Sequence, residues 1–210
     1  MARSAILHVM VQAALKAGKS LSRDFGEVQN LQVSLKGPGD YVSQADRKAE
    51  EIVKAELMRA RPDYGFLGEE GGATEGADTT HRWIVDPLDG TTNFLHGIPM
   101  FAISIALERQ GQIVAGVIYN PALDELYTAE KGGGTFLNDR RLRVAARTKL
   151  TDAVVGTGVP HLGRGHHGIY LVQLRNVMGE VAGVRRLGAA ALDLAYVAAG
   201  RFDGFWEEGL

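Results

Sequence analysis

The sequence contains no cysteine, which excludes disulfide bonds and thiolate metal sites. This composition fits a protein of a reducing compartment. Neither sign of charge is in clear excess, because 23 Lys and Arg residues stand against 25 Asp and Glu residues and give a net charge of −2. Without an overall positive field, we expect no charge-driven binding to nucleic acid or to an acidic membrane.

Long apolar runs are also missing. The most apolar N-terminal stretch, residues 5–17, is interrupted by His8, Gln12 and Lys16, so it lacks the clean apolar core of a secretory signal. No segment approaches the roughly 20 apolar residues that span a bilayer. We therefore expect a cytoplasmic protein without a membrane segment.

The 210 residues, of which 45% are hydrophobic, are enough for a substantial core in one large domain or two small ones. Up to residue 150, the periodicity predicts two helices followed by an antiparallel sheet, which is α+β order. Gln110-Gly111 is the clearest hairpin turn. The predicted helices cover about 3–24 and 43–57, short strands cover 64–67 and 83–85, and strand periodicity extends from 101 to 142.

After residue 150 the pattern changes to alternating strands and helices, which is α/β order. We therefore predict an N-terminal α+β domain over 1–150 and a partial C-terminal α/β domain over 151–210. No helix follows the last strand, so the second unit is expected to be incomplete. Its predicted strands are 153–157, 184–187 and 203–206, and its predicted helices are 166–179 and 189–199.

The most informative segment is residues 83–94, Trp-Ile-Val-Asp-Pro-Leu-Asp-Gly-Thr-Thr-Asn-Phe. Asp86 and Asp89 stand at the end of an apolar run with Pro87 in a turn between them, and carboxylates suit hard divalent cations. Gly90-Thr91 leads into a short helix whose first N–H groups suit a phosphate. Metal and phosphate held side by side favour phosphoryl transfer to water.

Each acidic pair also has a simpler interpretation. Glu69-Glu70 and Glu207-Glu208 can each be a solvated turn, and the segment from Asp86 to Thr91 can be an Asx turn followed by a helix cap. All three, however, follow strand-like segments, and strand ends converge along one edge of a sheet. Together they favour a metal site at that edge.

Three other groups are ambiguous. Ser43 and Asp46 match a capping box, the interpretation favoured from sequence alone, although both can also face the acidic cluster. Lys36 precedes a Gly-Pro-Gly turn and is expected at the surface. None of the six histidines has ligand spacing with a carboxylate, and His166-His167 is expected to open a helix facing solvent.

The motifs Gly68-Glu69-Glu70, Asp86 to Phe94 and Gly188 to Asp193 resemble the inositol monophosphatase family, especially its bacterial SuhB-type members. The resemblance implies the layered α/β/α/β/α sandwich shared with fructose bisphosphatases. It also implies two or three Mg²⁺ ions, lithium sensitivity, a homodimer and hydrolysis of inositol-1-phosphate by direct attack of water. The tail Thr92-Asn93-Phe94 weighs against phosphoadenosine phosphate and fructose-1,6-bisphosphate as substrates.

The resemblance also implies roles for individual residues. Glu69, Asp86 and the Leu88 carbonyl would bind the first Mg²⁺, and Asp86 with Asp89 would bind a second. Thr91 and Asp46 would orient the attacking water, assisted by Glu69, with Lys36 near the same water network. The residues expected to contact substrate are Glu69, Leu88, Asp89, Gly90, Thr91, Arg185, Gly188, Ala190 and Glu207.

Two departures from the family pattern affect these expectations. Ala189 stands where the family usually has Ser or Thr, which removes one hydroxyl contact to substrate. The chain stops at Leu210, before the Pro-Trp-Asp segment whose aspartate binds the second metal, so we expect weak or no turnover, or poor solubility. The alternative is a regulatory role: SuhB-type members act in transcription and RNA processing, which implies a protein partner.

Overall fold

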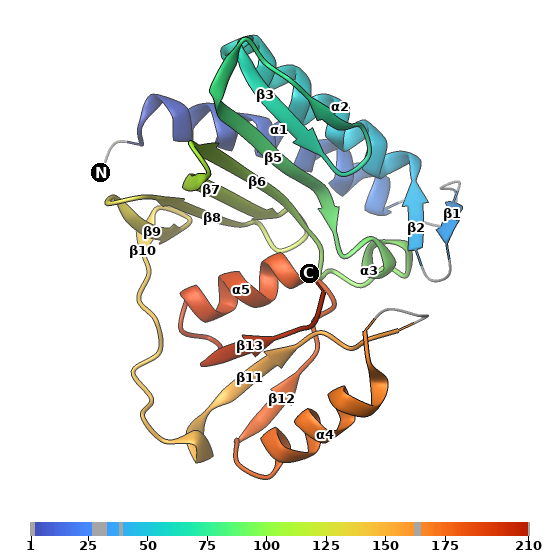
Figure 1. Ribbon diagram of the computed structural model, residues 1–210, viewed down its shortest axis with the longest axis vertical. Coiled ribbons are helices and arrows are strands. Elements are labelled where there is room, and N and C mark those ends of the chain that lie inside the picture. The colour runs from blue at the N-terminus through green and yellow to red at the C-terminus, as the bar shows by residue number, and fades with distance from the viewer. Residues whose placement is uncertain (1–2, 27–32, 38–39, 162–164, 210) are drawn as a thin grey trace.

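The structure is a computed structural model that describes residues 3–26, 33–37, 40–161 and 165–209; of 33–37 and 40–43 it describes the backbone alone. Its elements stack in five layers (Figure 1). Helices α1 (Ala5–Gly26) and α2 (Gln44–Ala60) cover an eight-stranded sheet. Helix α5 (Ala190–Ala198) separates that sheet from a three-stranded one, which α4 (His167–Met178) covers on its far side. The predicted layered α/β/α/β/α sandwich is confirmed.

Both N-terminal helices form where apolar periodicity predicts them. Leu7, Met10, Val11, Ala14 and Leu21 are buried in α1, which is the spacing of one helical face. Between the helices, β1 (Val33–Gly37) pairs antiparallel with β2 (Asp40–Ser43). Ser43 therefore ends a strand, and α2 begins one residue later. Residues 38 and 39 of the predicted turn lie outside the described part.

The large sheet has the order β10-β9-β8-β7-β6-β5-β3-β4. Its neighbours are antiparallel except β3 and β5, which run parallel, so their carboxyl ends lie side by side. The Gln110-Gly111 hairpin is confirmed, with positive φ at both residues. The strands are β3 (Tyr64–Gly68), β4 (Gly72–Thr74), β5 (Asp78–Asp89), β6 (Ala102–Arg109), β7 (Gln112–Asn120), β8 (Glu125–Glu130), β9 (Gly134–Leu137) and β10 (Arg140–Arg141).

The turn expected at Pro87 is wrong, because β5 continues through Asp89. The register against β6 pairs Asp86 with Ser104 and Asp89 with Ala102, so β5 carries one extra residue between its two aspartates. This is a β-bulge, a place that accommodates proline because one residue is left out of the ladder. The bulge keeps both carboxylates on one strand.

The C-terminal part follows the predicted alternation. A short 3₁₀ helix (Leu150–Asp152) leads into β11 (Val154–Thr157), which lies between β12 (Gly183–Arg185) and β13 (Gly204–Trp206), all parallel. Each element is within about two residues of its prediction. The domain boundary near residue 150 stays a prediction.

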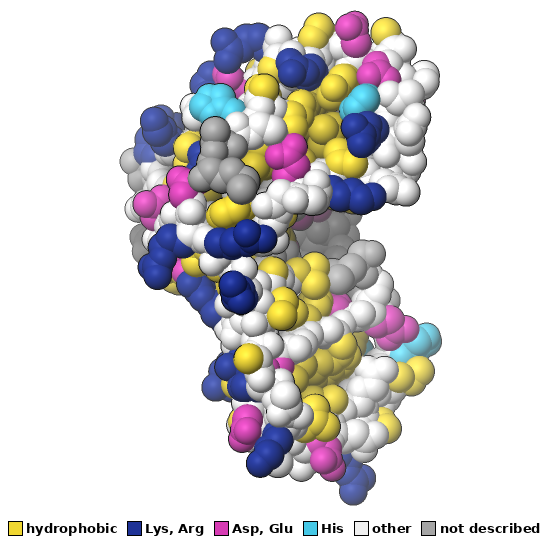
Figure 2. Space-filling model, turned by 90° about the vertical axis from the view of Figure 1, so that its left-hand side faces the viewer, with side chains coloured by type: hydrophobic (Ala, Val, Ile, Leu, Met, Phe, Trp, Pro, Cys, Tyr) yellow, Lys and Arg dark blue, Asp and Glu magenta, His cyan; other side chains and the backbone are white. Residues whose placement is uncertain are grey.

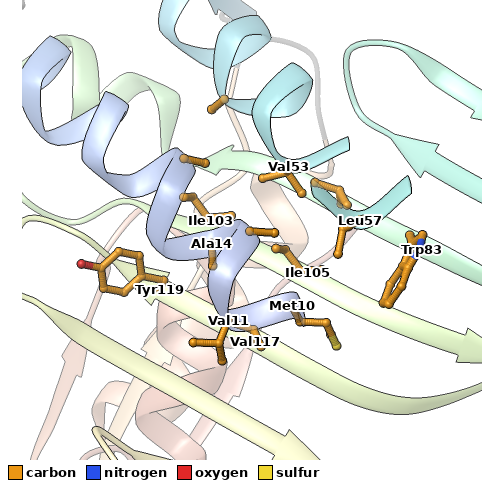
Figure 3. Close-up of a cluster of buried hydrophobic side chains, with 14 of the residues drawn as sticks. Met10, Val11, Ala14, Val53, Leu57, Trp83, Ile103, Ile105, Val117 and Tyr119 are labelled. Atoms are coloured by element: carbon orange, nitrogen blue, oxygen red, sulfur yellow. The ribbon is translucent and has the colours of Figure 1, made fainter. Parts of the chain in front are cut away.

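The main core lies between α1, α2 and the large sheet. Figure 3 shows Met10 and Val11 from α1 and Val53 and Leu57 from α2 directed toward the strands. All four are fully buried, as is Trp83 of β5. Across the part of the chain that the structure describes, no helix is long and apolar enough to cross a membrane. On the face in Figure 2, acidic and basic side chains are interspersed.

One ion pair joins the C-terminal part to the large sheet. The Arg201 guanidinium donates to both Glu125 oxygens, at 2.9 and 2.6 Å, and lies over the Tyr196 ring. Tyr127 also donates to Glu125, at 2.7 Å. This bidentate pair fixes the end of α5 against β8.

Candidate active site

The acidic segment at the end of β5 is held by hydrogen bonds between residues close in sequence. The Leu88 N–H donates to Asp86 Oδ1 at 3.0 Å, and the Thr91 hydroxyl donates to the Leu88 carbonyl at 2.9 Å. Helix α3 (Thr91–Leu95) begins directly after Gly90, whose φ of 89° is in the left-handed region. Glycine adopts that conformation at little cost, so the chain turns sharply from β5 into the helix.

Asp46 of α2 faces this network. It is 2% exposed, and the Thr91 hydroxyl lies 3.4 Å from its Oδ2. Of the two interpretations of Asp46, the structure therefore supports the one that turns it toward the acidic cluster. The Ser43 side chain lies outside the described residues, so the capping box stays a prediction.

Asp89 joins the two sheets. Ala189, the N-cap residue of α5, has no side chain that can cap the helix, and Asp89 Oδ2 instead accepts from the Ala191 N–H at 2.7 Å. A carboxylate at a helix N-terminus satisfies free N–H groups and favours the helix dipole. The start of α5 is thus capped by a residue of the large sheet.

Asn93 forms a second connection between the units. Its amide nitrogen donates to the Met100 carbonyl at 2.6 Å and to the Leu187 carbonyl at 2.8 Å. Asn93 is 5% exposed, so both N–H donors are satisfied inside the protein. This side chain fixes the loop that leads from β12 through Gly188 to α5.

On the substrate side, the structure singles out Arg186 and Asp193. The guanidinium of Arg185, the predicted substrate contact, donates to the adjacent Val184 carbonyl at 2.9 Å. Burial raises the pKa of Asp193 to about 7 and also raises the pKa of Glu207, and the charge of Arg186 opposes the shift in both groups. Asp193 is 2% exposed, and its Oδ1 has no hydrogen-bond partner among the described residues.

The assumption of one shared sheet edge is wrong. Glu69 follows β3 and Asp86 lies in β5, both in the large sheet, whereas Glu207 follows β13 in the three-stranded sheet. Glu207 nevertheless raises the pKa of Asp89, so its charge acts across the gap between the sheets. The acidic groups therefore face one another from two layers.

The comparisons with known proteins decide the family. The model of the inositol monophosphatase family matches residues 2–210. The chain belongs to the inositol monophosphatase family. Its members are phosphoric monoester hydrolases that generally depend on metal ions.

Close relatives of this family member carry two kinds of name. An inositol-1-monophosphatase of Mesorhizobium japonicum is 82% identical over 210 residues, which are 100% of this chain and 79% of the relative. A Nus factor SuhB of Pseudomonas aeruginosa is 44% identical over 209 residues, 98% of this chain and 77% of the relative. A crystal structure of the extragenic suppressor protein suhB from Bartonella henselae has a TM-score of 0.96 at 70% identity, covering 99% of this chain and 80% of that one.

The partly buried carboxylates of this phosphatase favour the binding of a cation. Burial is the largest cause that raises the pKa of Asp86, and the carboxylates of Asp89, Glu69 and Asp46 raise it further. Burial also raises the pKa of Asp89 to about 6, against the lowering effect of the Ala191 N–H. Buried carboxylates that repel one another need a positive charge nearby, and oxygen-rich sites of this kind suit hard divalent ions.

The described side chains include no group of three or more His, Asp or Glu that could together hold one ion. The family implies two carboxylates and the Leu88 carbonyl for the first ion. For the second ion it implies Asp86, Asp89 and the aspartate of the Pro-Trp-Asp segment, and this chain supplies the first two. The Leu88 carbonyl already accepts from Thr91, which leaves its second lone pair for another partner.

The remaining predicted residues are dispersed. Glu69 is exposed at the end of β3, while its neighbour Glu70 pairs with Arg47 at 3.6 Å. Gly188 has a φ of 82°, and Ala190 begins α5 beside Asp89. The backbone of Lys36 lies in β1, and its side chain is outside the described part.

Proposed function

We propose that this chain is a Mg²⁺-dependent phosphatase that hydrolyses inositol-1-phosphate or a similar sugar-alcohol monophosphate. The observation that carries the proposal is the partly buried carboxylate of Asp86 near the start of helix α3: burial raises its pKa, and the charges of Asp89, Glu69 and Asp46 raise it further. A helix start next to such a cluster suits a phosphate bridged to cations. The name of the Mesorhizobium japonicum relative, an inositol-1-monophosphatase, supports inositol-1-phosphate as the substrate.

Different residues of the chain would bind the metal, orient the water and bind the phosphate. Glu69, Asp86, Asp89 and the Leu88 carbonyl would hold Mg²⁺, which when bound supplies positive charge and lowers the pKa of a water. Thr91, whose hydroxyl lies between the Leu88 carbonyl and Asp46, would orient that water. The N–H groups of Gly90 and Thr91 would bind the phosphate.

The inositol side would be formed by the loop after β12 and by the end of β13. Gly188 and Ala190 would contact the ring, and Glu207 would accept hydrogen bonds from its hydroxyls. Arg185 belongs to the family-based set of contacts; the charge of Arg186 acts on Glu207 and makes it the stronger candidate. Lys36 stays a proposed member of the water network.

A substrate panel tests this proposal. We expect phosphate release from inositol-1-phosphate to require Mg²⁺, to stop with excess chelator and to return when Mg²⁺ is restored. At equal concentration, fructose-1,6-bisphosphate and phosphoadenosine phosphate should be hydrolysed at least about tenfold more slowly, a difference of about 1.4 kcal/mol in activation free energy. Equal or faster hydrolysis of either compound would contradict the assigned substrate.

A second function is supported by the relatives named SuhB, one of which is called a Nus factor. We propose that the chain also binds a protein of the transcription machinery through a surface that does not need the phosphatase site. A pull-down from native cells should recover the same partner with the parent chain and with Asp89→Asn. If Asp89→Asn failed to recover the partner that the parent chain recovers, partner binding would need the phosphatase site, and the proposal would be contradicted.

Three further properties are proposed on the family resemblance and the composition. They are a homodimer, inhibition by lithium and a cytoplasmic location. Sedimentation at several concentrations tests the first, and phosphate release at increasing LiCl with NaCl as the matched salt tests the second. Fractionation of native cells tests the third.

A further inference from the structure

Glu50 is a buried carboxylate that none of the assigned roles uses. It lies on α2, is 5% exposed, and accepts two backbone hydrogen bonds from consecutive residues. The Glu70 N–H donates to its Oε2 at 2.8 Å and the Gly71 N–H donates to its Oε1 at 2.7 Å. Hydrogen bonds to a charged acceptor are short and strong, so this loop is held at two adjacent points.

The glycines of the loop match this contact. A Cβ at Gly68 would be within 2.8 Å of both Glu50 oxygens, and a Cβ at Gly71 would be 2.7 Å from Oε1. Real side chains do not approach that closely, so residues 68 and 71 allow the carboxylate to approach the backbone. The loop from Gly68 to Gly71 is therefore built around Glu50.

The same loop carries Glu69. Among the described residues, no hydrogen bond or ion pair fixes the Glu69 side chain, which is exposed. Its direction is therefore set by its backbone, whose next two N–H groups are held by Glu50. Asp46 lies one helical turn before Glu50 on α2 and faces Thr91, so one helix face contacts both parts of the acidic cluster.

We propose that Glu50 is a positioning residue: its carboxylate fixes the backbone of residues 70 and 71 so that Glu69 is presented to a divalent cation beside Asp86. The inference rests on the proposed function, because it takes Glu69 as a metal ligand. It goes beyond that function by assigning the orientation of Glu69 to a residue that would contact neither metal nor substrate.

Glu50→Gln tests the inference, with Glu51→Gln as the matched control because Glu51 is the adjacent, exposed carboxylate on α2. The amide group of glutamine can accept only one of the two N–H groups, and its NH₂ would oppose the other. We expect Mn²⁺, the probe ion in calorimetric titration, to bind about tenfold more weakly to Glu50→Gln, in the range for residues that orient a metal ligand. Glu51→Gln should match the parent.

Hydrogen exchange supplies a readout that does not depend on metal. The amides of residues 70 and 71 should exchange at least about tenfold faster in Glu50→Gln, while amides in the α1 core keep the parent rates. Faster exchange throughout the chain would mean a general loss of stability, and unchanged Mn²⁺ affinity would mean that Glu69 needs no such support. Either result overturns the inference.

A second variant covers the case in which Glu50→Gln does not fold. Gly71→Ala leaves the charge of Glu50 in place but displaces its Oε1, and Gly168→Ala is the control because a Cβ there meets nothing within 4 Å. We expect Gly71→Ala to reproduce the loss of Mn²⁺ affinity, and parent-like affinity would contradict the inference. A parent chain that binds no Mn²⁺ contradicts the proposed function, and exchange at residues 70 and 71 then decides the role of Glu50 alone.

Discussion

Replacing Asp89 by asparagine is expected to lower the rate of phosphate release by about a thousandfold or more. The substitution keeps the size of the side chain and removes the negative charge that would bind the cation. Metal ions stabilise the charge of the transition state by several kcal/mol, and each 1.36 kcal/mol is about tenfold in rate. The measurement is the Mg²⁺-dependent rate with inositol-1-phosphate, together with a Mn²⁺ titration of the same variant.

Asparagine is informative here because Asp89 has a second role. Its Oδ2 caps α5 through the Ala191 N–H, and an asparagine oxygen can still accept that hydrogen bond. The fold should therefore survive while the charge is lost, and the melting temperature should stay within a few degrees of the parent. Asp63→Asn, at an exposed carboxylate, is the control. Phosphate release that persists in Asp89→Asn would mean that the site is wrongly assigned.

The parts of this molecule that could be predicted from sequence are those encoded by local patterns. Apolar spacing located α1 and α2, the Gln110-Gly111 pair located a hairpin, and the alternation after residue 150 located β11 and α5. The segment around Asp86 was recognisable because its residues are contiguous in sequence. Such features depend on short-range chemistry, which the order of residues records directly.

Features that depend on tertiary contacts were missed. Glu50 is one of several acidic residues on a predicted helix, and only the packing of α2 against the β3–β4 loop singles it out. The sequence does not show which of the adjacent residues Arg185 and Arg186 lies on the substrate side. Only the structure of β12 and the loop after it distinguishes them. A proline between two aspartates favours a turn as much as a bulge, so the sequence predicts a turn where the structure has the bulge in β5.

The acidic site should also make the stability of the metal-free protein depend on pH. Burial raises the pKa of Asp89 to about 6 and that of Asp193 to about 7, and neighbouring carboxylates contribute to both shifts. Each group binds its proton more tightly in the folded chain than in the unfolded one. Their contribution to stability is therefore complete below about pH 4 and is lost as pH rises through the folded pKa values.

Above pH 5.0, each group loses stability until the pH reaches its folded pKa. This interval is about one pH unit for Asp89 and about two for Asp193. At 1.36 kcal/mol per unit, and allowing for their mutual influence, we expect these two groups to lose about 3 kcal/mol, to which Asp86 adds a loss of the same sign because burial raises its pKa to about 9. For a chain of this size that corresponds to a melting temperature roughly 5 to 10 °C lower at pH 7.5 than at pH 5.0 in excess chelator. Carboxylates whose pKa is lowered by arginine, such as Asp203, titrate below this window and do not oppose the trend.

Mg²⁺ should reverse this loss, because an ion that binds only the folded protein with ionised carboxylates stabilises it in proportion to its occupancy. We therefore expect Mg²⁺ to raise the melting temperature more at pH 7.5 than at pH 5.0. Asp193→Asn should reduce the pH dependence of the metal-free protein, whereas Asp152→Asn, at an exposed position, should leave it unchanged. A metal-free protein that is equally stable at both pH values would show that these carboxylates do not repel one another in the folded chain. The charge that is proposed to recruit the cation would then be absent.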